Sequence, residues 1–143
     1  MRHLKKDKIK KMKTDFRQGQ LTISTTIDGE EKIFSVAANL ALSPFKASIK
    51  YTEDGDDIQI DIASRGVSIK RIGELTEELC FRKGQTEYGK IGLSGSEGDV
   101  GVKTEKLAYR ISEDSVLLQM TYRLLFGHGE QVTKIRLLAR IKN

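Results

Sequence analysis

The chain has 143 residues, of which 38% are hydrophobic and 31% are charged, and its formal net charge is +5. This composition supports one folded domain and argues against an extensively disordered chain. No apolar run approaches the roughly 20 residues that a membrane-spanning helix needs, and none follows the N-terminus as a secretory signal would. The single cysteine, Cys80, has no partner for an internal disulfide, so we expect a cytoplasmic protein.

The positive charge is concentrated at the N-terminus. Residues 1–17 hold eight Lys or Arg against two Asp, a net of +6, whereas residues 18–143 carry a net of −1. We therefore expect a basic N-terminal arm over residues 1–17 and a single domain over residues 18–143. The arm is either a frayed helix or chain end, or a segment that binds RNA or another acidic partner. Its candidate anion-binding residues are Lys5, Lys6, Lys8, Lys10, Lys11 and Lys13.

Beyond residue 18, apolar and polar residues alternate with the period of β-strands. We expect about ten strands, near residues 21–27, 34–42, 45–51, 58–62, 67–71, 75–81, 86–93, 97–111, 118–124 and 135–141. The short connections between them exclude parallel crossovers and favour an antiparallel, up-and-down order. Each strand has one apolar face, which the sheet buries by closing on itself. The sequence therefore predicts an all-β barrel of eight to ten strands, with a sandwich as the alternative.

A run of glycines at every third position, Gly89, Gly92, Gly95, Gly98 and Gly101, is the one stretch that looks like a motif. A phosphate-binding loop needs a Lys-Ser or Lys-Thr pair after its last glycine and a following helix, whereas Gly89-Lys90 is followed by Ile91 and the residues downstream alternate as a strand. Collagen needs proline-rich triplets, and this stretch contains no proline. We interpret the run as a hairpin that turns at "SGSEG", with the remaining glycines inside strands of a curved sheet.

The last strand of this hairpin contains a change of phase. Apolar residues occupy even positions as far as Val102 and odd positions from Leu107 onward. An extra residue between Thr104 and Lys106 explains the change, because a β-bulge shifts the alternation by one position and bends the strand. We therefore predict a bulge there, as the corner of a barrel requires.

The order of features from residue 51 onward resembles a known family. A Tyr-x-Glu pair (Tyr51, Glu53) is followed by "VSIKRIGELTEELCFRKGQT", "VGVKTEKLAY" and "LLQMTYRL" at similar spacing. Over residues 20–142 the chain resembles the YwiB-like bacterial family of unknown function. The resemblance implies a calycin-like, or lipocalin-like, β-barrel and leaves the activity open. The basic arm lies outside it.

Several polar residues fall at strand positions that should point into the barrel. They are Arg71, Tyr51, Glu53, Glu77 and Tyr122. An inward arginine needs a partner, because an unpaired buried guanidinium is very costly. Three alternatives remain open: an internal pair with Glu53 or Glu77, a bound ligand with a carboxylate, or a place at the barrel end where the side chain reaches water.

These residues define two function hypotheses. The first is a barrel that binds a small, amphipathic, anionic ligand through the five inward residues, and the second is an adaptor that uses the basic arm. An enzyme is less favoured, because no catalytic constellation is visible, and we expect no cofactor. No metal spacing joins His3, His128 and Cys80. We interpret the acidic stretch at residues 53–57 as a solvated turn rather than a calcium loop.

Overall fold

The computed structural model describes residues 15–142, which form ten β-strands and no helix. The strands are β1 (Arg17–Ile27), β2 (Glu30–Leu42), β3 (Lys46–Glu53), β4 (Asp56–Ala63), β5 (Gly66–Ile72), β6 (Leu75–Phe81), β7 (Thr86–Leu93), β8 (Ser96–Ile111), β9 (Ser115–Phe126) and β10 (Gly129–Ile141). The prediction of an all-β fold with about ten strands is confirmed. The arm lysines and the rest of residues 1–14 lie outside the described residues.

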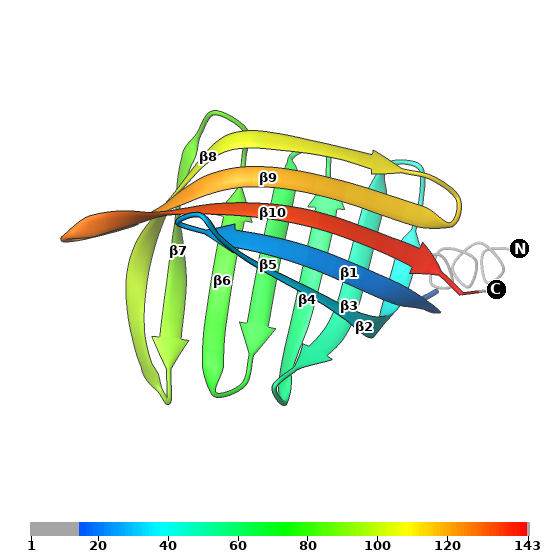
Figure 1. Cartoon of the computed structure of the whole chain (residues 1–143), viewed down its shortest axis with the longest axis horizontal. Coiled ribbons are helices and arrows are strands. Elements are labelled where there is room, and N and C mark those ends of the chain that lie inside the picture. The colour runs from blue at the N-terminus through cyan, green and yellow to red at the C-terminus, as the bar shows by residue number, and fades with distance from the viewer. Residues whose placement is uncertain (1–14, 143) are drawn as a thin grey trace, which may run out of the picture.

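Every strand pairs antiparallel with the next one along the chain, and β1 pairs with β10 to close the barrel. The up-and-down barrel is therefore confirmed, and the sandwich is not formed. Figure 1 shows that β8, β9, β10, β1 and β2 run across the molecule, while β3 to β7 cross behind them at a steep angle. The barrel thus consists of two strand groups that change direction at β8 and β2.

Pairing is incomplete where the two groups meet at β2 and β3. Only four residue pairs join these strands, from Asn39 opposite Lys50 to Leu42 opposite Ala47. On its other side, β2 pairs with β1 at all eleven positions from Glu30 to Leu40. The part of β2 before Asn39 therefore has a partner in β1 but none in β3. A wedge therefore opens between β2 and the end of β3, beside Tyr51.

Strand β8 forms the other corner. It pairs first with β7 and then with β9, and its register shifts between Thr104 and Lys106. The predicted bulge is confirmed at this position, with Glu105 as the extra residue. Because a bulge bends and twists its strand, β8 can leave one strand group and join the other, as Figure 1 shows.

The core lies on the inner face of the barrel. In β9, for example, Val116, Leu118, Met120 and Leu124 are buried at alternate positions. Phe45, which begins the expected strand 45–51 on the apolar side of its alternation, is instead 80% exposed and lies outside β3. The reason is local: the backbone N–H of Ser43 donates to the carbonyl of Lys46, which leaves Phe45 in the turn before β3.

The glycine run is the β7–β8 hairpin, as predicted. Gly95 has a φ of 86°, a left-handed conformation that suits glycine, and it forms the turn between the two strands. Gly89 is buried in β7, and a Cβ there would lie 2.7 Å from the carbonyl oxygen of Glu78. Gly98 has open space around it.

These two strand glycines provide a matched test of that interpretation. Gly89→Ala should lower the free energy of unfolding by about 1–3 kcal/mol, because the added methyl group overlaps backbone that cannot move freely. Gly98→Ala should be neutral or slightly stabilising, because the methyl group fits and the unfolded chain loses freedom. Urea unfolding of both variants measures the difference, and equal effects would contradict the packing assigned to Gly89.

Candidate functional site

A partly open cavity of about 350 Å³ lies inside one end of the barrel. Most of its wall is apolar and comes from inward residues of β1, β4, β5 and β6, among them Ile23, Ile58, Ile60, Ile69 and Leu79. Polar side chains converge on the same space from β3, β5, β6, β9 and β10. An enclosed space with apolar walls and a few convergent polar groups is the usual form of a small-molecule site.

All five inward polar residues of the sequence analysis line this cavity. Tyr51 and Glu53 come from β3, Arg71 from β5, Glu77 from β6 and Tyr122 from β9. Their meeting follows from strand alternation and from the register, which sets Arg71 directly opposite Glu77. Their contact with a ligand remains a prediction.

Arg71 is bound by two carboxylates. Its Nε donates to Asp56 Oδ2 at 2.8 Å, and its Nη1 donates to Glu53 Oε2 at 2.9 Å. A longer bond of 3.5 Å runs from Nη2 to the backbone carbonyl of Glu53. The side chain of Arg71 is 13% exposed and that of Asp56 is 6% exposed. Of the three alternatives for Arg71, the structure therefore shows the pair with a carboxylate of the protein itself. Glu53 was an expected partner, and Asp56 was not expected.

Asp56 was not among the predicted inward residues, and the interpretation of residues 53–57 as a solvated turn was wrong at this position. Asp56 is the first residue of β4 and is 5% exposed. Its Oδ1 also accepts the backbone N–H of Glu74 at 3.0 Å, in the turn between β5 and β6. Alternation contained the signal, because Asp56 precedes the inward Ile58 by two positions. The Arg71 hydrogen bond holds the pKa of Asp56 below its ordinary value.

This pairing removes the argument for an anionic ligand. That argument needed a guanidinium without a partner, whereas Arg71 already has the Asp56 and Glu53 carboxylates. A third carboxylate brought by a ligand would enter a region that is already rich in acceptors.

Glu77 differs from the other carboxyl groups at this end. It is half-buried and lines the cavity, yet no hydrogen bond or ion pair joins its carboxyl group to another side chain in residues 15–142. Burial raises the pKa of Glu77, the charge of Arg71 opposes that rise, and the charge of Glu53 adds to it. Burial likewise raises the pKa of Tyr51 and of Tyr122, so both phenols stay protonated at neutral pH.

Thr133 adds a second group without a partner, which the sequence analysis did not single out. It is 3% exposed, it lines the cavity, and its Oγ1 makes no hydrogen bond within the described part of the chain. Thr133 lies directly opposite Tyr122 of β9. The Tyr122 phenol is close by, but it forms no hydrogen bond with the Thr133 hydroxyl. A buried hydroxyl without a partner costs about 1–3 kcal/mol, unless a bound molecule supplies one.

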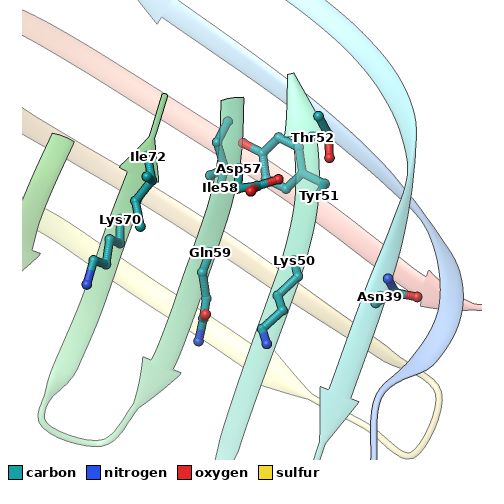
Figure 2. A pocket seen from close by; sticks show the side chains of 9 residues that line it. All are labelled: Asn39, Lys50, Tyr51, Thr52, Asp57, Ile58, Gln59, Lys70 and Ile72. Atoms are coloured by element: carbon teal, nitrogen blue, oxygen red, sulfur yellow. The ribbon is translucent and has the colours of Figure 1, made fainter. Parts of the chain in front are cut away.

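A groove of about 430 Å³ lies on the outer side of the barrel, beside the wedge between β2 and β3. Figure 2 shows Lys50, Gln59 and Lys70 next to one another on β3, β4 and β5, which agrees with their register. Tyr51 and Ile58 line this groove and also the internal cavity. The Phe34 and Tyr51 rings face each other across the wedge, with centroids 6.4 Å apart.

Other chemistry has little support in the described residues. No group of three His, Cys, Asp or Glu side chains in residues 15–142 is arranged to hold a metal ion. Cys80 is exposed, as the strand alternation indicates. His128 lies in the β9–β10 turn against Phe126, with ring centroids 6.4 Å apart. Within the same residues no helix is long and apolar enough to cross a membrane.

Fold and cavity together define a class of protein: a closed, ten-stranded, antiparallel β-barrel with a polar end to its internal space. The chain belongs to the family described as "Domain of unknown function (DUF1934)", whose model matches residues 20–137. The structure is similar to the crystal structure of the ywiB protein from Bacillus subtilis, with a TM-score of 0.77 and 14% sequence identity. That match covers 91% of this chain and 95% of the other. No curated protein matches the sequence.

The Arg71 network makes a prediction about stability. Arg71→Met should lower the free energy of unfolding by about 3 kcal/mol, because it leaves two carboxylates near each other with no cation between them. Adding Asp56→Asn to Arg71→Met should then cost less than Asp56→Asn costs alone, because its partner is already lost. Urea unfolding of the two single variants and the double variant measures this coupling.

Lys70→Met is the matched control, since it removes a neighbouring cation from the outer face of the same strand. It should change the free energy of unfolding by about 0.5 kcal/mol or less. Strict additivity of the Arg71 and Asp56 substitutions would contradict the network.

Proposed function

We propose that this protein binds a small amphipathic molecule inside its barrel, as lipocalin-like barrels hold one small ligand. The observation that carries the proposal is the cavity of about 350 Å³, in which apolar walls lead to Tyr51, Arg71, Glu77 and Tyr122. This volume lies at the low end of the roughly 300–1,000 Å³ range of small-molecule sites. The exposed single cysteine is consistent with the cytoplasm as the place of action.

Two features support binding at this position. The buried Thr133 hydroxyl lacks a partner, and a ligand with a polar group would provide one. The wedge between β2 and β3 offers a route, because Tyr51 lines both the outer groove and the cavity. A ligand would enter past the Phe34 and Tyr51 rings, where β2 and β3 are no longer paired.

Native mass spectrometry of the purified full-length protein tests this proposal by looking for a co-purified small molecule. Binding of the neutral dye Nile red, followed by fluorescence, gives an independent measurement. Ile69→Trp should weaken dye binding about tenfold or more, because Ile69 lines the cavity and the larger side chain fills it. Lys70→Trp is the control, because Lys70 lines the outer groove and not the cavity.

The two variants separate the outcomes. Loss of dye binding in Ile69→Trp alone places the dye in the barrel. Loss in Lys70→Trp alone places it in the outer groove and contradicts the proposal. The absence of both a co-purified molecule and dye binding in the wild-type protein also contradicts it.

A second candidate function is an adaptor for an acidic partner, with RNA as the partner to test. The arm lysines on which it was based lie outside the described residues, but one surface observation favours it. On the outer face of β8, β9, β10 and β1, a groove of about 630 Å³ is lined by Lys106, Lys134 and Arg136. None of these three forms an ion pair within residues 15–142, whereas Arg123 nearby is bound by Glu105 and Glu130.

Affinity for a single-stranded RNA, measured at several salt concentrations, tests the adaptor. Removal of residues 1–14 should weaken binding and flatten its salt dependence, because each lost phosphate contact lowers the slope by about 0.7. The double substitution Lys134→Gln and Arg136→Gln should do the same to a smaller extent. Lys50→Gln with Lys70→Gln removes equal charge from another face and should have little effect. RNA affinity that is equal in all four proteins would end this candidate.

A further inference from the structure

We infer that the molecule bound in the barrel carries a positively charged nitrogen, and that the Glu77 carboxylate binds it. The inference rests on the proposed function and names the chemical class of its ligand, an amphipathic amine. It replaces the anionic ligand that the sequence suggested. The observations that support it are the charge at the cavity end, the missing partner of Glu77 and the unsatisfied hydroxyl of Thr133.

Carboxylates outnumber cations around Arg71. Glu53 and Asp56 bind the guanidinium directly, and Glu77 lies opposite it on β6. Lys32, which also lines the cavity, is a second cation, so three carboxyl groups against two cations leave a formal charge of −1 when all of them are ionised. An incoming anion would add to that charge, whereas an incoming ammonium group would reduce it.

Glu77 is the member of this group that is free to bind. Arg71 uses its Nε and Nη1 on the other two carboxylates, and no hydrogen bond joins its guanidinium to Glu77. The Glu77 carboxyl group is half-buried and lines the cavity without a side-chain partner in the described part of the chain. Burial without a partner disfavours its ionised form, and an ammonium group within reach would reverse that effect.

The neighbouring polar atoms also suit a donor. An alkylammonium group has three N–H donors and no acceptor, so it needs oxygen atoms on several sides. Thr133 Oγ1 is buried and has no partner, and it lines the same cavity as Glu77. The Tyr51 and Tyr122 phenols add two oxygen acceptors and two aromatic faces, which attract cations. Thr133 does not belong to the acidic group, so its free oxygen supports a ligand here independently of charge; Thr104 Oγ1 also lacks a partner, but it does not line the cavity.

Lys32 is the rival occupant from the protein itself. Lys32 lies near the start of β2 and also lines the cavity, although the residue is exposed. No ion pair joins Lys32 to Glu77 or Glu53. If Lys32 competes for Glu77, its removal should strengthen binding of a cation. If the ligand is an anion, removal of Lys32 should weaken binding instead.

Isothermal titration calorimetry of the full-length protein with three probes of equal chain length tests the inference at neutral pH. The probes are octylammonium, octanol and octanoate, which share the apolar part and differ in the charge of the polar end. Octylammonium should bind about tenfold or more tightly than octanoate. Glu77→Gln should remove most of this preference and leave octanol affinity nearly unchanged, because it deletes the charge and keeps the side-chain shape.

Glu78→Gln is the matched control, since Glu78 is the next residue of β6 and is exposed. It should leave the affinities of all three probes within about twofold. Lys32→Gln should raise octylammonium affinity or leave it unchanged. Thermal melting of each variant without probe confirms that the protein is folded.

The outcomes distinguish the inference from the proposed function. Octanoate binding more tightly than octylammonium, or a preference that survives Glu77→Gln, overturns the amine ligand and leaves the barrel as a binding protein. Absence of binding by all three probes and by Nile red contradicts the proposed function itself. Equal effects of Glu77→Gln and Glu78→Gln overturn the assignment to Glu77.

Discussion

The polar end of this barrel depends on one cation, Arg71, held inside by two carboxylates. Removing a guanidinium from water costs several kcal/mol, so it must be repaid by close partners. Asp56 and Glu53 supply those partners from the two ends of one turn, between β3 and β4.

Asp56 also binds the backbone of Glu74, so the same network joins that turn to the one between β5 and β6. The side chain of Asp56 packs against Gly73, where a methyl group would overlap the carboxylate. The network therefore fixes the rim of the cavity and leaves Glu77 as the carboxyl group without a partner.

A second constraint is closure. The ten strands follow one another around the closed barrel, and the sheet changes direction at two places in two different ways. In β8 the extra residue Glu105 bends one continuous strand, so pairing is retained on both sides. At β2 and β3 the strands separate after four residue pairs, so pairing is lost. The first solution produces a sealed corner, and the second produces the wedge beside Tyr51. The wedge that we propose as the ligand's route thus lies where β2 and β3 stop pairing.

The sequence predicted the backbone better than the site. Alternation and turn residues were enough for the ten strands, and the change of phase near Thr104 was enough for the bulge, because both are local signals. Phe45 was misplaced, since only the Ser43–Lys46 hydrogen bond shows where β3 begins. Alternation also gathered Tyr51, Glu53, Arg71, Glu77 and Tyr122 on one inner surface. It could not decide which carboxylate would bind Arg71, because that choice depends on side-chain geometry across strands. Nor could it decide whether the barrel contained free space, because this depends on the summed volume of all inward side chains.

The chemistry of the cavity then follows from which hydrogen-bonding groups remain free after folding. Folding uses the Nε and Nη1 donors of Arg71 on Asp56 and Glu53. The groups that remain toward the cavity include the Glu77 carboxyl group, which only accepts when it is ionised, and the hydroxyls of Thr133, Tyr51 and Tyr122, which can accept or donate. An inward arginine in a barrel suggests an anion when it is read alone. Here that reasoning does not apply, because Glu53 and Asp56 already bind the guanidinium and Glu77 is the carboxyl group without a partner in the described residues. The apolar walls would provide affinity for any hydrophobic chain, and the unpaired acceptors would select the charge at its end.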